Sequence, residues 1–325
     1  MKTFKSKTTD GRRDHYQELT DTVVAALEAG TAPWRRPWDP DKSAGSATPV
    51  NAATGRRYRG VNTLVLGMSS LAFVSGDPRW CSYRQASERG WQVRKGEKGA
   101  TIYFYKPLEV KDSSAPAGED VLKIVPLLRI FTVFHASQID GVPEFITPNA
   151  PKPLQKRIED ADLIMKASGV TLRTGGDRAF YSPATDHIQL PPDASFHSPE
   201  DWAVTALHEL SHASGAAHRL NRDLTGRFGS SAYSREELRA EISSMYVGSE
   251  IGIPTAIPNH ASYIQSWIKI LKEDKREILR AAADAQKIAD YILSFHPHYA
   301  LAQPDQIGAA DDRSDGSPAD EALAA

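Results

Sequence analysis

Hydrophobic residues recur at helical spacing in several parts of the chain. In residues 16–30 the apolar positions are three or four residues apart, and Gly30 can end the helix that they predict. The same spacing predicts four further helices, over residues 153–169, 198–215, 234–252 and 261–293. Residues 61–67 also suit a short helix. Amphipathic helices are therefore expected in both halves of the chain.

Strand patterns occur between these helices. β-branched and aromatic residues are concentrated in residues 100–110 and 121–139, and residues 179–191 resemble a strand pair. Helices and strands that do not alternate regularly predict an α+β fold.

Three prolines in residues 147–153 mark the best domain boundary. We therefore expect two domains, over residues 1–148 and 149–302. Residues 303–325 are acidic, small and free of aromatic side chains, and they predict a disordered tail.

Composition narrows the class of protein. The chain has 325 residues, of which 40% are hydrophobic and 25% charged, which is enough for two globular domains. The single cysteine, Cys81, excludes an internal disulfide and fits a reducing compartment. The polar N-terminus lacks the apolar core of a signal peptide, and no segment approaches the length of a membrane helix. We expect a cytoplasmic protein that does not contact a membrane.

Residues 206–218, ALHELSHASGAAH, contain the motif H-E-x-x-H on a predicted helix that Ser198 can cap. Histidines four residues apart point from one helical face, so His208 and His212 can bind one Zn²⁺. Glu209 is rotated by about 100° from His208 and can take the proton of a water molecule at the metal. Residues 186–191, just before the helix, predict an edge strand to which an extended peptide could add. The motif thus predicts a zinc-dependent peptidase.

The third metal ligand has two candidate sources. His218 completes the longer pattern H-E-x-x-H-x-x-G-x-x-H of the metzincins, for which Met245 would supply a methionine-containing turn, although it falls in a predicted helix. Glu237 and Glu241 instead share one helical face, so that one can bind zinc and the other can hold a ligand histidine. Ser234 and Glu237 also fit a capping box, which would leave the metal to Glu241. The local residues leave these alternatives open.

Charge is distributed unevenly along the chain. Residues 1–110 carry 18 Lys+Arg against 11 Asp+Glu, or +7, and the remaining residues carry 21 against 30, or −9. Cations that follow a phosphate backbone, with aromatic rings for unpaired bases, are typical of single-strand binding. The same aromatic residues can equally be packing residues. The candidate DNA-binding residues are Trp34, Arg35, Arg36, Trp38, Arg56, Arg57, Tyr58, Arg59, Asn62, Trp80, Tyr83, Gln85, Arg94, Lys95 and Lys98.

Taken together, these segments resemble the ArdC-type antirestriction proteins, whose N-terminal domain also occurs in TraC-type plasmid primases. The matching blocks include LEAGTAPWRRPW, RWCSYRQASERGWQVRKGEKGATIYFY and HELSHASGAAHRLNRDL, and the resemblance runs from about residue 16 to about residue 295. It implies a single-stranded-DNA-binding domain followed by a zincin-like metallopeptidase domain. It also implies Glu237 as the third ligand, because R-L-x-R and a glutamate-bearing helix follow H-E-x-x-H in that family.

The resemblance implies a function as well. Such a protein would bind single-stranded DNA and protect incoming plasmid or mobile-element DNA from host restriction, with a restriction component as one candidate for its peptidase substrate. The alternative hypothesis is an intracellular zinc protease whose basic domain only recruits DNA-associated substrates.

Overall fold

The protein is described here by a computed structural model that covers residues 13–30, 48–69, 71, 76–111, 122–146, 152–253 and 261–300. For residues 106–111, 123–126 and 261–262 it describes the backbone alone. The expected domain boundary at residues 148 and 149 and the acidic tail lie outside the described residues.

The N-terminal half is built around a four-stranded sheet in the order β1-β2-β5-β4. Parallel pairing joins β1 to β2, and the other two pairings are antiparallel. A separate two-stranded pair, β3-β6, lies beside it. The elements of this half are α1 (His15–Glu28), β1 (Val50–Asn51), α2 (Val61–Gly67), β2 (Arg79–Ser82), α4 (Tyr83–Glu88), β3 (Gln92–Val93), β4 (Ala100–Lys111), β5 (Leu122–His135), η1 (Ala136–Gln138) and β6 (Ile139–Asp140).

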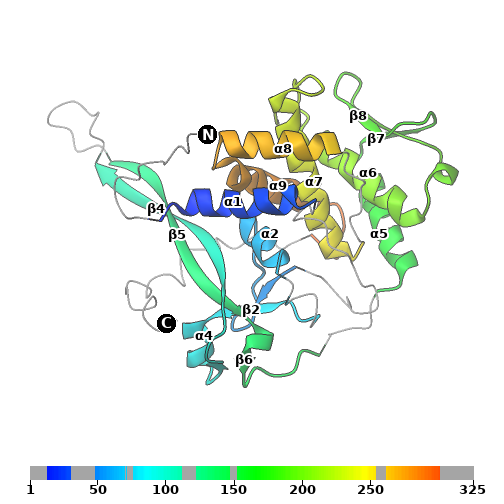
Figure 1. Cartoon of the computed structure of the whole chain (residues 1–325). Coiled ribbons are helices and arrows are strands. Elements are labelled where there is room, and N and C mark those ends of the chain that lie inside the picture. Colours follow the sequence, from blue (N-terminus) through cyan, green and yellow to red (C-terminus); the bar gives the residue numbers. More distant parts are fainter. Residues whose placement is uncertain are drawn as a thin grey trace.

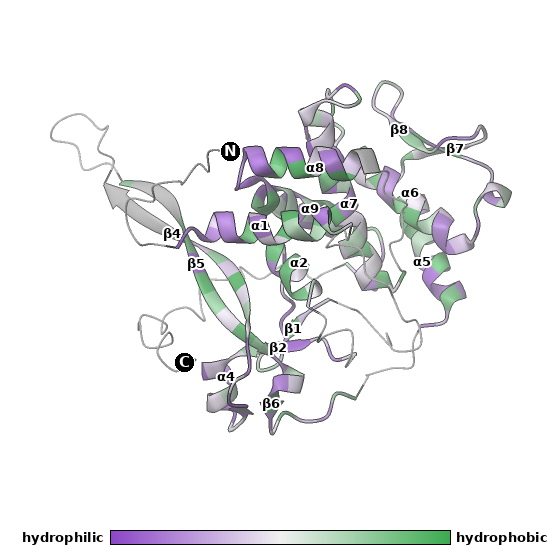
Figure 2. Ribbon diagram, in the orientation of Figure 1, coloured by the Kyte–Doolittle hydropathy of each residue, from purple (hydrophilic) through white to green (hydrophobic). Residues whose placement is uncertain are grey.

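The C-terminal half combines a small sheet with a group of helices. Its three strands are ordered β7-β9-β8, with β7 parallel and β8 antiparallel to β9. Figure 2 shows that hydrophobic and hydrophilic residues are mixed along α5 and α6, as the amphipathic pattern predicts. The elements are α5 (Leu154–Ala167), β7 (Thr171–Thr174), β8 (Phe180–Ser182), β9 (His187–Leu190), η2 (Asp193–Ser195), α6 (Pro199–Ala213), α7 (Ser231–Ile251), α8 (Ala261–Glu273) and α9 (Glu277–Leu293).

One hydrophobic core joins the two halves. Leu19, Val23 and Leu27 of α1 belong to the same buried cluster as residues of α6, α7, α8 and α9, and α1 packs on α8. The Tyr246 hydroxyl on α7 donates to the carbonyl of Gly60, just before α2, at 2.7 Å. In Figure 1, α1 lies across the molecule between the β4–β5 hairpin and the C-terminal helices. The N-terminal helix is therefore part of the packing that holds the C-terminal half.

The predicted α+β fold is confirmed, with two corrections. Residues 261–293 form two helices, because the chain turns at Asp274, whose carboxylate accepts from the Arg276 amide at 2.9 Å. Strand β9 is the middle strand of its sheet, so the expectation that residues 186–191 form an edge strand is wrong. No helix in the described ranges is long and apolar enough to cross a membrane.

Candidate metal centre and nucleic-acid interface

Helix α6 carries the H-E-x-x-H motif. Ser198 caps this helix by accepting from the Asp201 amide at 3.2 Å, and Pro199 occupies its first turn. Leu207 and Leu210 face the core with 1% and 0% of their surface exposed. This burial fixes the rotation of α6, so that the opposite side of its last turns presents His208 and His212 to α7.

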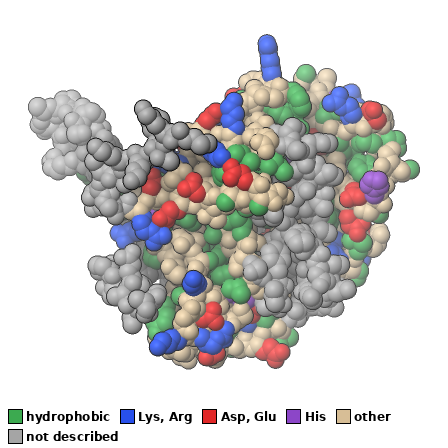
Figure 3. All heavy atoms as spheres, viewed as in Figure 1, with side chains coloured by type: hydrophobic (Ala, Val, Ile, Leu, Met, Phe, Trp, Pro, Cys, Tyr) green, Lys and Arg blue, Asp and Glu red, His purple; other side chains and the backbone are tan. Residues whose placement is uncertain are grey.

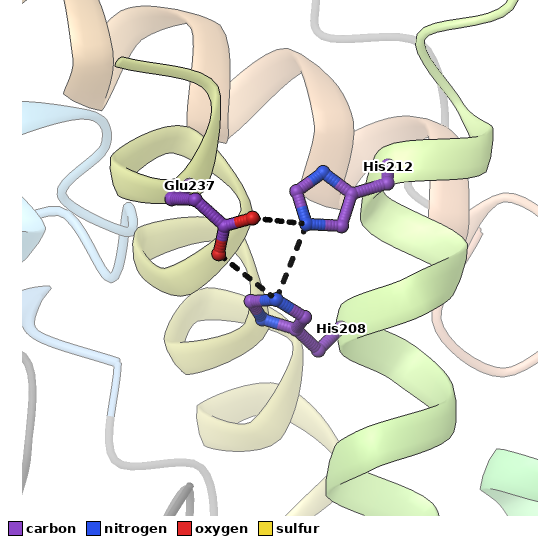
Figure 4. A group of neighbouring side chains, drawn as sticks. All are labelled: His208, His212 and Glu237. Carbon is purple, nitrogen blue, oxygen red and sulfur yellow. Dashed lines mark hydrogen bonds and ion pairs between the residues drawn. The ribbon is translucent and has the colours of Figure 1, made fainter. Parts of the chain in front are cut away.

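Three side chains from α6 and α7 point at one another, as Figure 4 shows. The Nε2 atoms of His208 and His212 are 3.2 Å apart. The two carboxylate oxygens of Glu237 lie 3.7 Å from Nε2 of His208 and 3.5 Å from Nε2 of His212. One ligand atom from each residue falls within 4.8 Å of the others. The arrangement brings together two imidazoles and one carboxylate from two adjacent helices.

The hydrogen-bond partners of His212 show which of its nitrogens carries the proton. Its Nδ1 lies 3.3 Å from Oε1 of Glu236, a carboxylate that can only accept, so Nδ1 donates and, in the neutral ring, Nε2 keeps its lone pair. That lone pair faces Nε2 of His208 at a distance at which two neutral acceptors would repel each other. Among the described residues, Nδ1 of His208 has no hydrogen-bond partner; it is buried, 3.7 Å from Oε2 of Glu241. The three inward-facing donor atoms therefore suit a cation.

Glu236 is itself held by Arg222. The Nη2 atom of Arg222 donates to Oε1 of Glu236 at 2.7 Å and to the Ser211 carbonyl on α6 at 2.7 Å. Gly215 makes room for this arginine, because a Cβ at residue 215 would lie 3.0 Å from Nη2 and 2.9 Å from Cδ2 of Leu224. The sequence alone singles out neither Glu236 nor a role for Arg222; the R-L-x-R motif is the signal that points to this arginine.

Four carboxylates make the site strongly favourable for positive charge. Glu209, Glu236, Glu237 and Glu241 are all less than 9% exposed. Burial opposes the charged form of His208, but Glu237, Glu209 and Glu241 outweigh it and raise the pKa of His208 to about 9. Burial also opposes the charge of Glu237, but the histidines and the Tyr233 hydroxyl lower the pKa of Glu237 to about 2. A proton or a metal cation between these groups is therefore stabilised.

Of the other candidates for the third ligand, Glu241 lies at Nδ1 of His208 rather than at Nε2, and His218 lies elsewhere. The His218 side chain is 64% exposed and its Nε2 is 3.5 Å from Oδ2 of Asp186, away from the two motif histidines. Met245 is buried inside α7 rather than in a turn. Helix α7 begins at its cap Ser230, so Ser234 lies within the helix and does not form the expected capping box with Glu237.

The comparisons with known proteins agree with this geometry. A model of zincin-like metallopeptidases matches residues 159–284, and a model of the N-terminal domain of the anti-restriction factor ArdC matches residues 13–134. The metal-free crystal structure of the antirestriction ArdC protein from plasmid R388 aligns with a TM-score of 0.71 and 37% identity over 87% of this chain and 98% of that one. The chain belongs to the ArdC antirestriction family. The resemblance inferred from the sequence is thereby confirmed.

Other relatives of this ArdC-family chain differ in length. An uncharacterized protein of Sinorhizobium fredii is 40% identical over 91% of this chain and 96% of its own length. A DNA primase TraC of Escherichia coli is 43% identical over 87% of this chain, but the match spans only 27% of the primase. A Mn(II)-bound crystal structure of the R388 ArdC protein aligns with 36% identity and the same TM-score of 0.71.

Several residues expected to contact DNA are buried in the ArdC-like half. Trp80 is 1% exposed and Tyr58 is 7% exposed, so neither ring offers a face to a base. The buried amide of Asn62 bonds to the backbone nitrogen and oxygen of Tyr103 at 2.7 and 2.8 Å. Gln85 completes the cap of α4 with Ser82. These four side chains hold the domain together.

Two of the predicted arginines join the halves of the molecule. Arg57 pairs with Glu250 at the end of α7, and Arg59 pairs with Asp290 on α9. Nearby, the Gly60 amide donates to Oε1 of Gln286 at 2.9 Å. The basic loop is thus docked on carboxylates of the C-terminal half.

The remaining candidates are exposed or lie outside the described residues. Arg94 pairs with Glu97 at 2.9 Å and with Asp140 at 3.3 Å, although its side chain is 44% exposed. Figure 3 shows basic and acidic side chains mixed along the lower edge of the visible face, over α4 and β6. Arg56, Tyr83, Lys95 and Lys98 are exposed. Trp34, Arg35, Arg36 and Trp38 fall in a segment that the structure does not describe.

Proposed function

We propose that this chain is an antirestriction protein that binds single-stranded DNA with its N-terminal half and cleaves protein at a zinc-dependent site in its C-terminal half. The observation that carries the peptidase proposal is the facing pair of Nε2 atoms, 3.2 Å apart, with the Glu237 carboxylate beside them. Membership of the ArdC family supports the antirestriction role.

The metal ligands in this proposal are His208, His212 and Glu237. Two imidazoles and a carboxylate suit Zn²⁺, and a three-residue set leaves a coordination position for water or substrate. The related R388 ArdC protein has been crystallised with Mn(II), so metal analysis should distinguish the two ions. When bound, the metal would supply Lewis acidity to a water molecule and to a peptide carbonyl.

Glu209 is the proton carrier in this proposal. It follows His208 on α6 and its charge helps to raise the pKa of His208, so its carboxylate lies near the site; at 8% exposed it is largely shielded from bulk water. A carboxylate in this place can take a proton from the attacking water and pass it to the leaving amine. Tyr263, whose hydroxyl is 3.1 Å from that of Tyr233, is a candidate donor to the oxygen of the tetrahedral intermediate.

The N-terminal half would act on the incoming DNA. DNA that enters a recipient as a single strand has exposed base faces and a continuous line of phosphates, and both suit a basic surface with aromatic side chains. Protein bound along this strand would keep restriction subunits away from the DNA while the complementary strand is made. The net charge of +7 over residues 1–110, from 18 Lys+Arg and 11 Asp+Glu, supports this assignment.

The variant Glu209→Gln tests the peptidase proposal. We expect it to bind as much zinc as the wild type, measured by elemental analysis of the dialysed protein, because Glu209 is not a ligand. It should lose hydrolysis of an unfolded protein substrate by at least about 100-fold, since a general base typically contributes 10²–10⁴-fold.

The control is Glu159→Gln, which removes an exposed carboxylate of α5 and should change neither the zinc content nor the rate of hydrolysis. A wild-type protein that binds no metal, or full hydrolysis by Glu209→Gln, would contradict the peptidase proposal. Plasmid transfer into restricting and non-restricting recipients, repeated with Glu209→Gln, then measures whether protection depends on proteolysis.

A further inference from the structure

The β4–β5 hairpin packs on the main core with one face, and on its other face the rest of the molecule covers only the part around Ile102, which is 3% exposed. Paired residues of antiparallel strands share a face, and successive residues alternate between faces. Tyr103 pairs with Ile130 on one face, which packs on the main core beside α1. On the other face Phe104 pairs with Arg129, and Ile102 pairs with Phe131. In Figure 1 this hairpin extends away from the helices.

Beyond Ile102, this second face exposes aromatic and apolar side chains. Phe104 is 42% exposed and Leu127 is 40% exposed. Phe104 and Phe131 pack edge to face, with ring centroids 5.5 Å apart and an interplanar angle of 76°. Packing against Phe131 fixes the orientation of the Phe104 ring while leaving much of its surface to solvent. We call Phe104, Leu127, Arg129 and Phe131 the hairpin face.

Arg129 lies at the centre of the hairpin face. It stands between Leu127 and Phe131 on β5, directly opposite Phe104 on β4, and it is exposed. In the part of the chain that the structure describes, no carboxylate pairs with it. Arg57 and Arg59, by contrast, are paired with Glu250 and Asp290. Arg129 is therefore an arginine beside aromatic rings that an external anion can approach without breaking an ion pair to any described side chain.

The charge of the two strands favours a polyanion. By the register of the strands, Lys106, Lys123 and Arg129 lie on the side of Phe104, and no Asp or Glu of the two strands does; Asp112, Glu119 and Asp120 lie in the connecting segment. An apolar protein partner would not require this excess. A nucleic acid strand would use both features, because its bases stack on rings and its phosphates pair with cations.

We propose that the hairpin face is the surface on which single-stranded DNA binds, with a base stacked on Phe104 and a neighbouring phosphate paired with Arg129. This assignment rests on the proposed DNA-binding function and gives it a location. It replaces the buried rings of Tyr58 and Trp80 as the stacking surface. A duplex does not offer its base faces, so the hairpin face should discriminate against double-stranded DNA.

The test is a fluorescence-anisotropy titration of a labelled oligothymidine with the full chain at two salt concentrations. Phe104→Leu keeps apolar contact with Phe131 but removes the aromatic face, and Arg129→Gln removes the charge. We expect each to weaken single-strand binding by on the order of tenfold. Arg129→Gln should also reduce the slope of log affinity against log salt concentration by about one, which corresponds to the loss of one phosphate contact. Phe104→Leu should leave this slope unchanged.

Matched controls separate the hairpin face from general effects. Phe104→Tyr restores a ring and should bind like the wild type. Arg173→Gln removes an exposed charge from β7 and should have no effect on the affinity. Circular dichroism establishes that each variant is folded.

The outcomes are distinguishable. If the wild type binds single strands no better than a duplex, the proposed DNA-binding function fails. If the wild type prefers single strands but Phe104→Leu and Arg129→Gln bind equally well, the function stands and the hairpin face is not the site. If these variants instead abolish a dimer seen by light scattering, the face belongs to a second copy of the chain and the proposal is overturned.

Discussion

At the scale of single residues, the metal centre depends on side chains that do not face the metal. Glu236 accepts from Nδ1 of His212, so that in the neutral ring the lone pair of Nε2 faces His208 and Glu237. Arg222 fixes Glu236 with bonds of 2.7 and 3.2 Å. The H-E-x-x-H motif reveals the histidines but not this tautomer, because the partner comes from another helix 24 residues later in the chain.

We expect Glu236→Gln to weaken zinc binding by about 10- to 100-fold, which is typical when the partner of a ligand histidine is changed. The amide keeps the size of the side chain but loses the charge that holds Arg222 and favours Nδ1–H on His212. Competition with a chromophoric chelator measures the affinity, with Glu159→Gln as the control. Affinity equal to that of the wild type would show that the tautomer is set without Glu236.

At the scale of elements, the sequence predicts the helices and strands that are specified by neighbouring residues. The cap at Ser198 and the stripe of α6 are confirmed, as is the strand pair over residues 179–191. The break between α8 and α9 was missed, because the apolar spacing continues across Asp274 while packing sends α8 to α1 and α9 to α7. Trp80 was considered for DNA binding because its neighbours are basic, but β2 is an interior strand of its sheet.

The residues of the candidate sites also divide into those that a local motif reveals and those that depend on the fold. His208, Glu209 and His212 follow from one motif on one helix, whereas Glu237 needed the family resemblance because two glutamates of α7 fit the local pattern. Phe104 and Arg129 could not be selected from sequence. Which side chains of a two-stranded hairpin stay exposed depends on where α1 and the second core cluster pack.

The end of β5 provides a prediction about pH. His135 is 0% exposed; its Nδ1 accepts from the Ser137 amide at 3.1 Å, so Nε2–H donates to the Asp77 carbonyl at 2.7 Å. Burial lowers the pKa of His135 below its usual value of 6.5. The unfolded chain therefore binds a proton at a higher pH than the folded chain does. Stability contributed by His135 is present above pH 6.5 and is lost as the pH falls towards the folded pKa.

Urea unfolding at pH 7.5 and 5.5 measures this effect. The loss attributable to one such group is at most about 1.4 kcal/mol per pH unit. His135→Asn keeps an acceptor for the Ser137 amide but cannot be protonated, so it should be less stable at pH 7.5 and lose less on acidification. An equal acid-induced loss in both proteins would exclude His135 as the titrating group.

At the scale of the whole molecule, the two halves share their packing. Leu27 of α1 is 1% exposed and belongs to the same cluster as Trp267 of α8. The Thr20 hydroxyl donates to the Lys275 carbonyl at 2.9 Å, and the Arg276 guanidinium lies 4.9 Å from the centroid of the Tyr16 ring. With Arg57 and Arg59 docked on α7 and α9, the N-terminal half contacts the helices that surround the metal centre from two sides. Loss of α1 packing should therefore also destabilise the metal centre.

Leu27→Ala tests this coupling. Removal of a buried leucine side chain costs about 2–5 kcal/mol, and a shared core distributes that loss over both halves. Calorimetry should show one transition for the wild type, and the whole transition should move to lower temperature in Leu27→Ala. Added zinc should raise the temperature of this whole transition, since a ligand that binds only the folded state stabilises everything that unfolds with its site. Leu172→Ala, at a site 42% exposed on β7, should shift it little. If Leu27→Ala instead produces an early transition that zinc does not move, the halves unfold independently and α1 does not support the metal centre.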